Sequence, residues 1–217
     1  MRHLSRRLRD ALRAAPILLL GGVLTPGIGH IAVHAGTVAG EGGQSRDEAD
    51  ALQRKLEAIV RFGAIPRLET LATPIAEGEV NAYLIHHLTG DIPPGIASPA
   101  VRILGDQRVS ATATLDLDAL NASRPPADGF DPLRLLKGQL PAKVSGRLVT
   151  ENGAGRFELD SAELAGIPLP RMIVSQLVTR YSISEDQPQG ISLDDPFDLP
   201  ASIREIRVEP GQVIVVQ

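Results

Sequence analysis

Two adjacent histidines, His86 and His87, are the first side chains to consider for metal chemistry in this chain. Imidazole nitrogen is a common ligand of transition metals. Neighbouring residues on a helix point about 100° apart, so the two rings cannot readily share one metal ion. Neither a second histidine nor a cysteine lies four residues away. We therefore expect His87 at the edge of an apolar stripe, His86 in solvent, and no bound metal.

The acidic residues offer two further arrangements that could do chemistry. Asp194, Asp195 and Asp198 could surround a calcium ion, but the segment lacks the spaced oxygens and the glycine turn of a calcium loop. Asp116 and Asp118 could form a catalytic pair, yet no partner residue for acid–base catalysis can be named. No serine lies in a nucleophile elbow. The sequence therefore predicts a protein that is not an enzyme, with no catalytic residue, no metal and no cofactor.

Composition limits the classes of function. The 217 residues are 43% hydrophobic, enough for one domain with a real core. The absence of cysteine excludes disulfides and zinc-thiolate sites. Aromatic residues make up only 3% of the chain, which argues against stacking on bases or sugars. Beyond the Arg-rich first 13 residues, 17 basic and 25 acidic residues remain, so the formal charge is −8. An acidic body is repelled by phosphate backbones, and no nucleic acid partner is expected.

The N-terminal segment has the order of an export signal. Residues 1–39 contain an Arg-rich start, an apolar run from Ala14 to Leu24 and a zone of small residues. This order predicts a signal peptide or, if it is not cleaved, an N-terminal anchor. Residues 40–45 then form a linker, and residues 46–217 a single α+β domain. We expect an exported protein, periplasmic or secreted, or one anchored in the inner membrane.

Three main helices are predicted in the body of the chain. Ser45 and Glu48 have capping-box spacing and predict a helix over 46–62. A second helix begins near Glu77 and ends before Gly90. A third begins at Pro170, and its apolar side chains cover so wide an arc that it must be buried, or face a sheet on one side and a ligand on the other. A brief fourth helix is expected over 131–138.

The strands are predicted from alternation and turn signals. Residues 108–117 alternate most regularly, with Val109, Ala111, Ala113, Leu115 and Leu117 on one dry face. Residues 101–104 pair with this strand across a turn at 105–107. A second hairpin joins 143–150 to 156–164 through an Asn-Gly turn, with a bulge near Ser161 or Ala162 to restore the phase of Leu164. A third hairpin spans 203–217, after an ordered loop, DDPFDLP.

The order of elements, with the segments AEGEVNAYL, GIPLP and FDLPASIREIRVEPGQVIVV, resembles small exported bacterial proteins of the tubular lipid-binding (TULIP-like) superfamily over 75–217. The resemblance implies a strongly curved antiparallel β-sheet, built from hairpins and wrapped around one or more helices, with lipid acyl chains between them. The chain is short and corresponds to one half-module, so a groove is expected in place of an enclosed tunnel.

The dry faces of the predicted strands and helices are the expected walls of this hydrophobic groove. They contain Val80, Tyr83, Leu84, Val109, Ala111, Ala113, Leu115, Leu117, Phe157, Leu159, Ile173, Leu177 and Tyr181. The expected partner is a lipid or another hydrophobic small molecule, with transient membrane contact, and the oligomeric state stays open. The alternative is a ligand-free interaction module that assists assembly of the cell envelope. Ala111 and Ala113 bear on the choice, because small residues leave space for a helix or a ligand.

Overall fold

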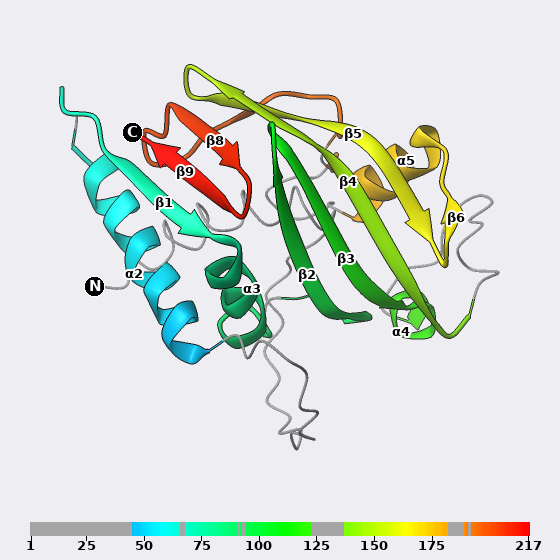
Figure 1. The fold of residues 1–217 in the computed structure, drawn as a ribbon. Helices are drawn as coiled ribbons and strands as arrows, with labels where there is room; N and C mark the ends of the chain where they lie inside the picture. The colour runs from blue at the N-terminus through cyan, green and yellow to red at the C-terminus, as the bar shows by residue number, and fades with distance from the viewer. Residues whose placement is uncertain are drawn as a thin grey trace.

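The structure is a computed structural model that describes residues 45–65, 68–90, 92, 94–122, 137–181, 189–190 and 192–217. The predicted signal segment, most of the linker and most of the predicted brief helix at 131–138 lie outside these residues. The described chain is α+β, with an open antiparallel sheet of six strands and a second sheet of three (Figure 1). None of the helices within the described ranges is long and apolar enough to cross a membrane.

The small sheet contains the first and the last strand of the described chain. The helices are α2 (Arg46–Gly63), α3 (Glu77–His86), α4 (Leu117–Ala122) and α5 (Arg171–Tyr181). The small sheet has the order β1 (Ala72–Ala76), β9 (Gln212–Val216), β8 (Glu205–Glu209). The large sheet has the order β2 (Ile96–Gly105), β3 (Arg108–Asp116), β4 (Gln139–Glu151), β5 (Ala154–Leu164), β6 (Ile167–Pro168), and β7 (Phe197–Asp198) also pairs with β5. All the strands of the large sheet thus lie between β1 and β8 in the sequence.

Helices α2 and α3 cover the small sheet. The predicted capping box is present, since the Ser45 hydroxyl accepts from the Glu48 amide and the Glu48 carboxylate accepts from the Ser45 amide, at 3.2 and 3.0 Å. The small-sheet core consists of Leu52, Ile59, Ile75, Tyr83, Ile203 and Val215. These residues come from α2, α3, the neighbouring strands β1 and β9, and the segment before β8. The small sheet therefore has its own core, which the helices complete.

Two predicted hairpins of the large sheet are confirmed, and three of their four strands, β2, β4 and β5, are longer than expected. The turns Asp106-Gln107 and Asn152-Gly153 have positive φ at both residues, as two-residue hairpins of this twist require. Strand β2 begins at Ile96 instead of Val101, because it is an edge strand that tolerates Pro99 beside a register shift. Strand β4 begins at Gln139 instead of Lys143. Pro141 has no backbone N–H to donate. Strand β4 tolerates it because it lies just beyond the last pair of β4 and β5, Ala142 with Leu164, and its carbonyl still accepts from the Ala165 amide.

Two further predictions about the strands are corrected. The strand predicted over 108–117 ends at Asp116, because Leu117 starts α4, where its side chain is 1% exposed. The loop predicted over DDPFDLP contains β7, which pairs with Ala154 and Gly155. A Cβ at Gly155 would lie 2.6 Å from the ring of Phe197, so only glycine allows this close approach. The third hairpin is confirmed, with its turn at 210–211.

The two sheets are joined by side chains that substitute for a neighbouring strand. Asn81 on α3 accepts from the Val101 amide at 2.7 Å and donates to the Val101 carbonyl at 2.8 Å. Glu77 accepts from the amide of Ile103 at 2.7 Å. These bonds satisfy the outer edge of β2, which would otherwise leave buried backbone groups unpaired. Helix α3 therefore contacts both sheets (Figure 1).

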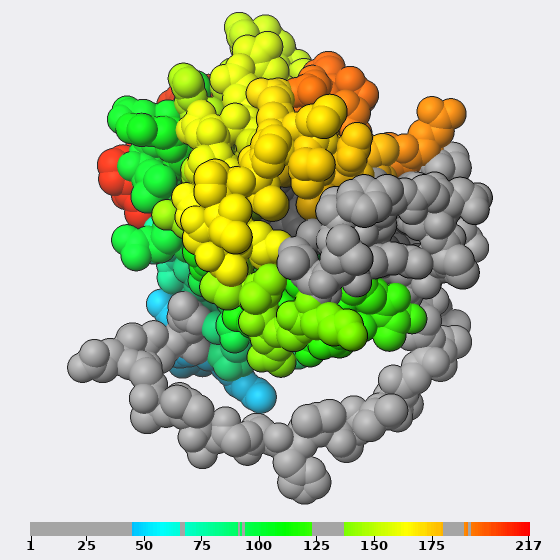
Figure 2. All heavy atoms as spheres, turned by 90° about the vertical axis from the view of Figure 1, so that its right-hand side faces the viewer, coloured from blue at the N-terminus to red at the C-terminus, as the bar shows by residue number. Residues whose placement is uncertain are grey.

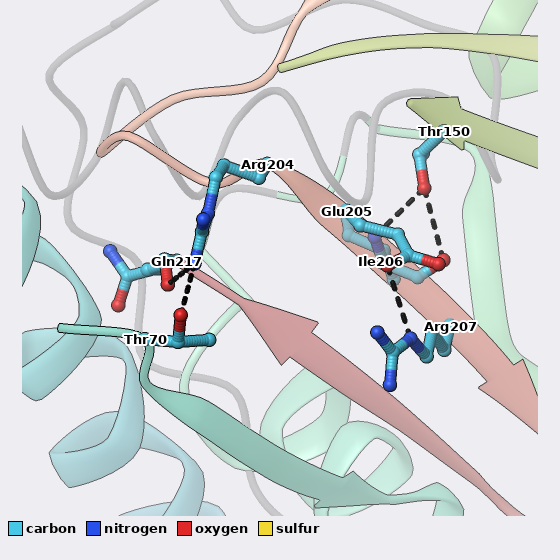
Figure 3. A network of polar contacts seen from close by, with 7 residues as sticks. All are labelled: Thr70, Thr150, Arg204, Glu205, Ile206, Arg207 and Gln217. Carbon is cyan, nitrogen blue, oxygen red and sulfur yellow. Dashed lines mark hydrogen bonds and ion pairs between the residues drawn. The ribbon is translucent and has the colours of Figure 1, made fainter. Parts of the chain in front are cut away.

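A second joint involves the last hairpin (Figure 3). The Thr150 hydroxyl accepts from the Ile206 amide at 2.8 Å and donates to the Ile206 carbonyl at 3.0 Å, across the two sheets. On the other side of this hairpin, the Arg204 guanidinium donates to the Thr70 hydroxyl and to the Gln217 carbonyl. The small sheet is thereby tied both to the end of β4 and to the segment before β1.

Candidate hydrophobic binding face

The apolar face of the large sheet is built from side chains on one side of β2, β3, β4 and β5. The strand register arranges them in rows across the sheet. The rows are Leu148 with Phe157; Ile103, Val109, Gly146 and Leu159; Val101, Ala111, Val144 and Ala162; Ala113, Ala142 and Leu164; and Ile96, Leu115 and Leu140. The face is continuous over four strands, and its rows contain the ring of Phe157; the ring of Phe197 on β7 covers Gly155 at the end of β5 on the same side.

A bulge keeps β5 in phase with this face. Ser145 pairs with Ser161 while Gly146 pairs with Leu159, so Asp160 is the extra residue. This confirms the bulge that the sequence predicts, one residue before the expected position. Without it, Ala162 and Leu164 would point to the solvent side. A bulge also bends the strand and increases its twist.

The ring of Phe157 fills the space beside Gly146. A Cβ built at Gly146 would lie 2.5 Å from Cζ of Phe157 and 2.4 Å from the carbonyl oxygen of Glu158. Phe157 itself is 4% exposed. The glycine is therefore needed for packing, and the space above it holds a side chain of the protein.

One end of the face, called here the α3 end, is packed into a core. Its rows are those of Leu148, Ile103 and Val101. Helix α3 contributes Leu84, and α5 contributes Val174, with the partly buried Val178 beside it. The buried members of this core are Leu84, Val101, Ile103, Val109, Ala111, Phe157, Ala162, Val174, Leu193 and Val208. This end behaves as an ordinary protein interior.

The other end, called the α4 end, holds the rows of Ala113 and Leu115. Ile96, Leu115, Leu140 and Ala142 are half-buried there, whereas Ala113 and Leu164 are buried. None of the six belongs to either core of the described residues. The same face is thus core at one end and incompletely covered by the described elements at the other.

Helix α4 borders this end and is held in place by carboxylates. The Asp116 carboxylate accepts from the Ala119 amide at 2.9 Å, and that of Asp118 accepts from the Gly138 amide at 2.9 Å. The Ala119 N–H, followed by the Gln139 amide, lowers the pKa of Asp116 below its ordinary value. The pair considered above for catalysis thus positions a helix.

The structure divides the predicted groove residues among several places. Leu84, Val109, Ala111 and Phe157 are buried at the α3 end, with Leu159 packed against them, while Ala113 and Leu115 lie at the α4 end. Val80 contacts both cores. Tyr83 belongs to the small-sheet core, where its hydroxyl donates to Gln53. Ile173 and Leu177 are half-buried on α5 outside both cores, Leu117 lies in α4, and the side chain of Tyr181 lies outside the description.

The sequence reasoning missed most of the contribution of β4. Leu140, Ala142, Val144 and Leu148 alternate as regularly as the residues of β3. The sequence predicts the strand only from Lys143, so Leu140 and Ala142 are left out of it, and Val144 and Leu148 are not assigned to the groove. On α5 the residues that enter the core are Val174 and Val178, one position after Ile173 and Leu177, two of the three residues predicted there.

The histidines and aspartates serve structural roles. His87 Nε2 lies 2.8 Å from an Asp50 oxygen on α2, and its ring contacts that of Tyr83. Asp194 forms an ion pair with Arg171. Within the described ranges, no group of three or more His, Cys, Asp or Glu side chains is placed to hold a metal ion.

Comparison with known proteins finds no relative. A scan against protein-family models gives no match to this chain. Searches of curated proteins and of solved structures give no significant match either.

Proposed function

We propose that the protein binds a lipid or another hydrophobic small molecule at the α4 end of the apolar face. The observation that supports this is the row of Ile96, Leu115 and Leu140, which is apolar, half-buried and outside both cores. Burying such a row against an acyl chain is favourable, at about 25 cal/mol for each Å² of apolar surface removed from water. We also propose that the protein is exported, as its N-terminal sequence predicts, and that it carries the ligand or helps to maintain the cell envelope.

The chemistry of the row favours an aliphatic ligand. Its side chains are isoleucine and leucine, the next row adds Ala113, Ala142 and Leu164, and the ring of Phe157 is buried at the other end. Ligand sites combine an apolar lining with a few polar groups that orient the ligand. The neighbouring polar pair on these strands, Asp116 and Gln139, whose side chains approach to 3.4 Å at the border of α4, alternates to the opposite side of the sheet. The tubular lipid-binding arrangement, a curved sheet wrapped around α5, belongs to this proposal, and the bulge at Asp160 supports its curvature.

The test compares a pair of alanines at the α4 end with a single alanine in the core of the same face. Ala113 and Ala142 face each other at the α4 end, whereas Ala111 lies in the core. Native mass spectrometry and lipid extraction of the purified full chain should detect a bound hydrophobic molecule. Ala113→Leu with Ala142→Leu should reduce ligand occupancy at least about tenfold with little loss of stability, since leucine takes the ligand's space. Ala111→Leu should cost about 1–3 kcal/mol of stability through overpacking.

Each outcome bears on the proposal. A wild-type protein that is reproducibly empty and binds no apolar probe contradicts it. A double variant that keeps its ligand places the site elsewhere on the chain and also contradicts it.

A further inference from the structure

Two neighbouring segments at one corner of the large sheet carry no charged side chain. They are residues 138–142, which lead into β4, and residues 164–170, which include β6. The Ala165 amide donates to the Pro141 carbonyl, so the two segments are in contact. Together with the start of α5 they form what we call the β6 corner, whose exposed residues are Gln139, Pro141, Ala165, Gly166, Ile167, Pro168, Pro170, Arg171 and Met172. Although 22% of the chain is charged, Arg171 is the one charged residue of this corner.

The two largest side chains of the β6 corner point into solvent. Ile167 and Met172 are each 66% exposed. Atoms of β6 and of the beginning of α5 lie on the surface that faces the viewer in Figure 2. Ile167 pairs with Leu164, a residue of the α4 end, so the exposed corner continues the apolar face of the sheet.

The backbone of the corner is also suited to an apolar layer. Strand β6 is the outer strand of the sheet, and such edges normally present unpaired N–H groups. Pro168 and Pro170 have no N–H, and the Leu169 amide donates to Ala162 at 2.8 Å. Unpaired donors are costly in a layer without water. The corner therefore exposes apolar side chains with few donors that would lose their hydration.

We propose that the β6 corner inserts into the interfacial layer of a lipid bilayer, where the ligand enters or leaves the α4 end. This rests on the proposed function, since it names the partner from which the ligand comes. Arg171 is the one basic residue of the corner, and it is paired with Asp194. Attraction to anionic headgroups therefore contributes little, and a zwitterionic surface is the partner that fits. With only two large side chains inserted, the affinity should be below the roughly 10⁴ M⁻¹ of a single myristoyl chain.

The absence of cysteine allows a test at single positions in the full chain. Ile167→Cys and, as the matched control, Leu68→Cys are each labelled with a small environment-sensitive fluorophore. Leu68 is also fully exposed but lies between α2 and β1. The proteins are mixed with phosphatidylcholine vesicles that contain spin-labelled lipid. The label at 167 should be quenched and the label at 68 should not. Adding Met172→Asp to the Ile167→Cys protein should weaken the vesicle affinity seen at 167 about tenfold.

The control position separates the corner from the apolar N-terminal segment, which could bind vesicles by itself. Equal quenching at 167 and 68, or none at 167, overturns the proposal. Quenching that requires anionic lipid also overturns it, as does a dimer that buries position 167 without lipid. Lipid extraction from the purified protein is a separate measurement, so a protein that carries lipid yet shows no quenching keeps the proposed function and loses this inference.

Discussion

The two ends of the apolar face share the same strands but differ in what covers them. Strand β3 contributes Val109 and Ala111 to the α3 end, and Ala113 and Leu115 to the α4 end. At the α3 end, α3 and α5 supply Leu84 and Val174, and the residues form a core. At the α4 end, Leu115 stays half-buried. An alternating strand therefore determines which side is apolar, while helices far away in the sequence determine whether that side becomes core.

The position of α3 explains why the boundary falls where it does. Asn81 and Glu77 bind the backbone of β2 at Val101 and Ile103, which are the rows of the α3 end. The opposite end of β2 is contacted by α4, where a Cβ at Gly95 would lie 2.6 Å from Cγ of Leu120. A helix of six residues covers less of a sheet than one of ten. The rows that lie outside both cores of the described residues are those beyond the reach of α3.

The largest expected difference between the two ends is in the cost of removing a side chain. Phe157→Ala should destabilise the protein by about 3–5 kcal/mol, because it removes a buried ring and leaves a cavity beside Gly146. Leu115→Ala should cost less than about 2 kcal/mol, since that side chain is half-buried and lies outside both cores. Urea unfolding of the ligand-free proteins measures both. Equal costs would mean that the α4 end is a packed core and would remove the distinction.

A smaller effect is expected for the contact that sets the boundary. Asn81→Ala should cost about 2–4 kcal/mol, because the Val101 amide and carbonyl would stay buried without partners. Ser145→Ala is the control. It removes a hydroxyl contact of 2.8 Å to Ser161 on the solvent side of the same sheet, and should cost less than about 1 kcal/mol. If both variants lose the same free energy of unfolding, the hydrogen bonds of Asn81 to Val101 do not hold α3 on the edge of β2.

Local features of the fold could be predicted from the sequence because their causes are local. The capping box at Ser45 and the Asn152-Gly153 turn follow from short-range chemistry. The bulge could be predicted because the apolar phase shifts between Leu159 and Leu164. Each of these needs only residues that are close in the chain.

Long-range features could not be predicted. The pairing of β1 with β9 joins residues more than 130 positions apart, such as Ala72 and Val216. Nothing in either segment specifies the other, and the last hairpin could equally have extended the large sheet. The role of Asn81 could not be predicted, because its partner, the edge of β2, exists only in the folded protein.

The candidate site could be predicted in part for the same reason. The alternation of β3 identified its apolar residues, and the structure places them on one face. Tyr83 and Leu84 are neighbours in α3 yet belong to different cores, because α3 lies between two sheets. A single predicted sheet could not separate them.

The smallest expected effect concerns the support of α4. Hydrogen bonds from Ala119 and Gln139 lower the pKa of Asp116 below its ordinary value of 3.8, so the carboxylate is favoured in the folded state. A group with a lowered folded pKa stabilises the protein above its unfolded pKa, and this contribution is lost as the pH falls through the folded value. The wild type should therefore be slightly more stable than Asp116→Asn at neutral pH. The difference should begin to shrink near pH 3.8 and vanish once the pH falls below the lowered pKa of the folded state. Thermal unfolding of both proteins across this range measures it.

Asp116→Ala, which lacks any acceptor for the Ala119 amide, should stay less stable than Asp116→Asn throughout, because only the acceptor distinguishes them. A difference between wild type and Asp116→Asn that does not change with pH would mean that Asp116 does not hold α4 as a carboxylate, and the border of the α4 end would need another support.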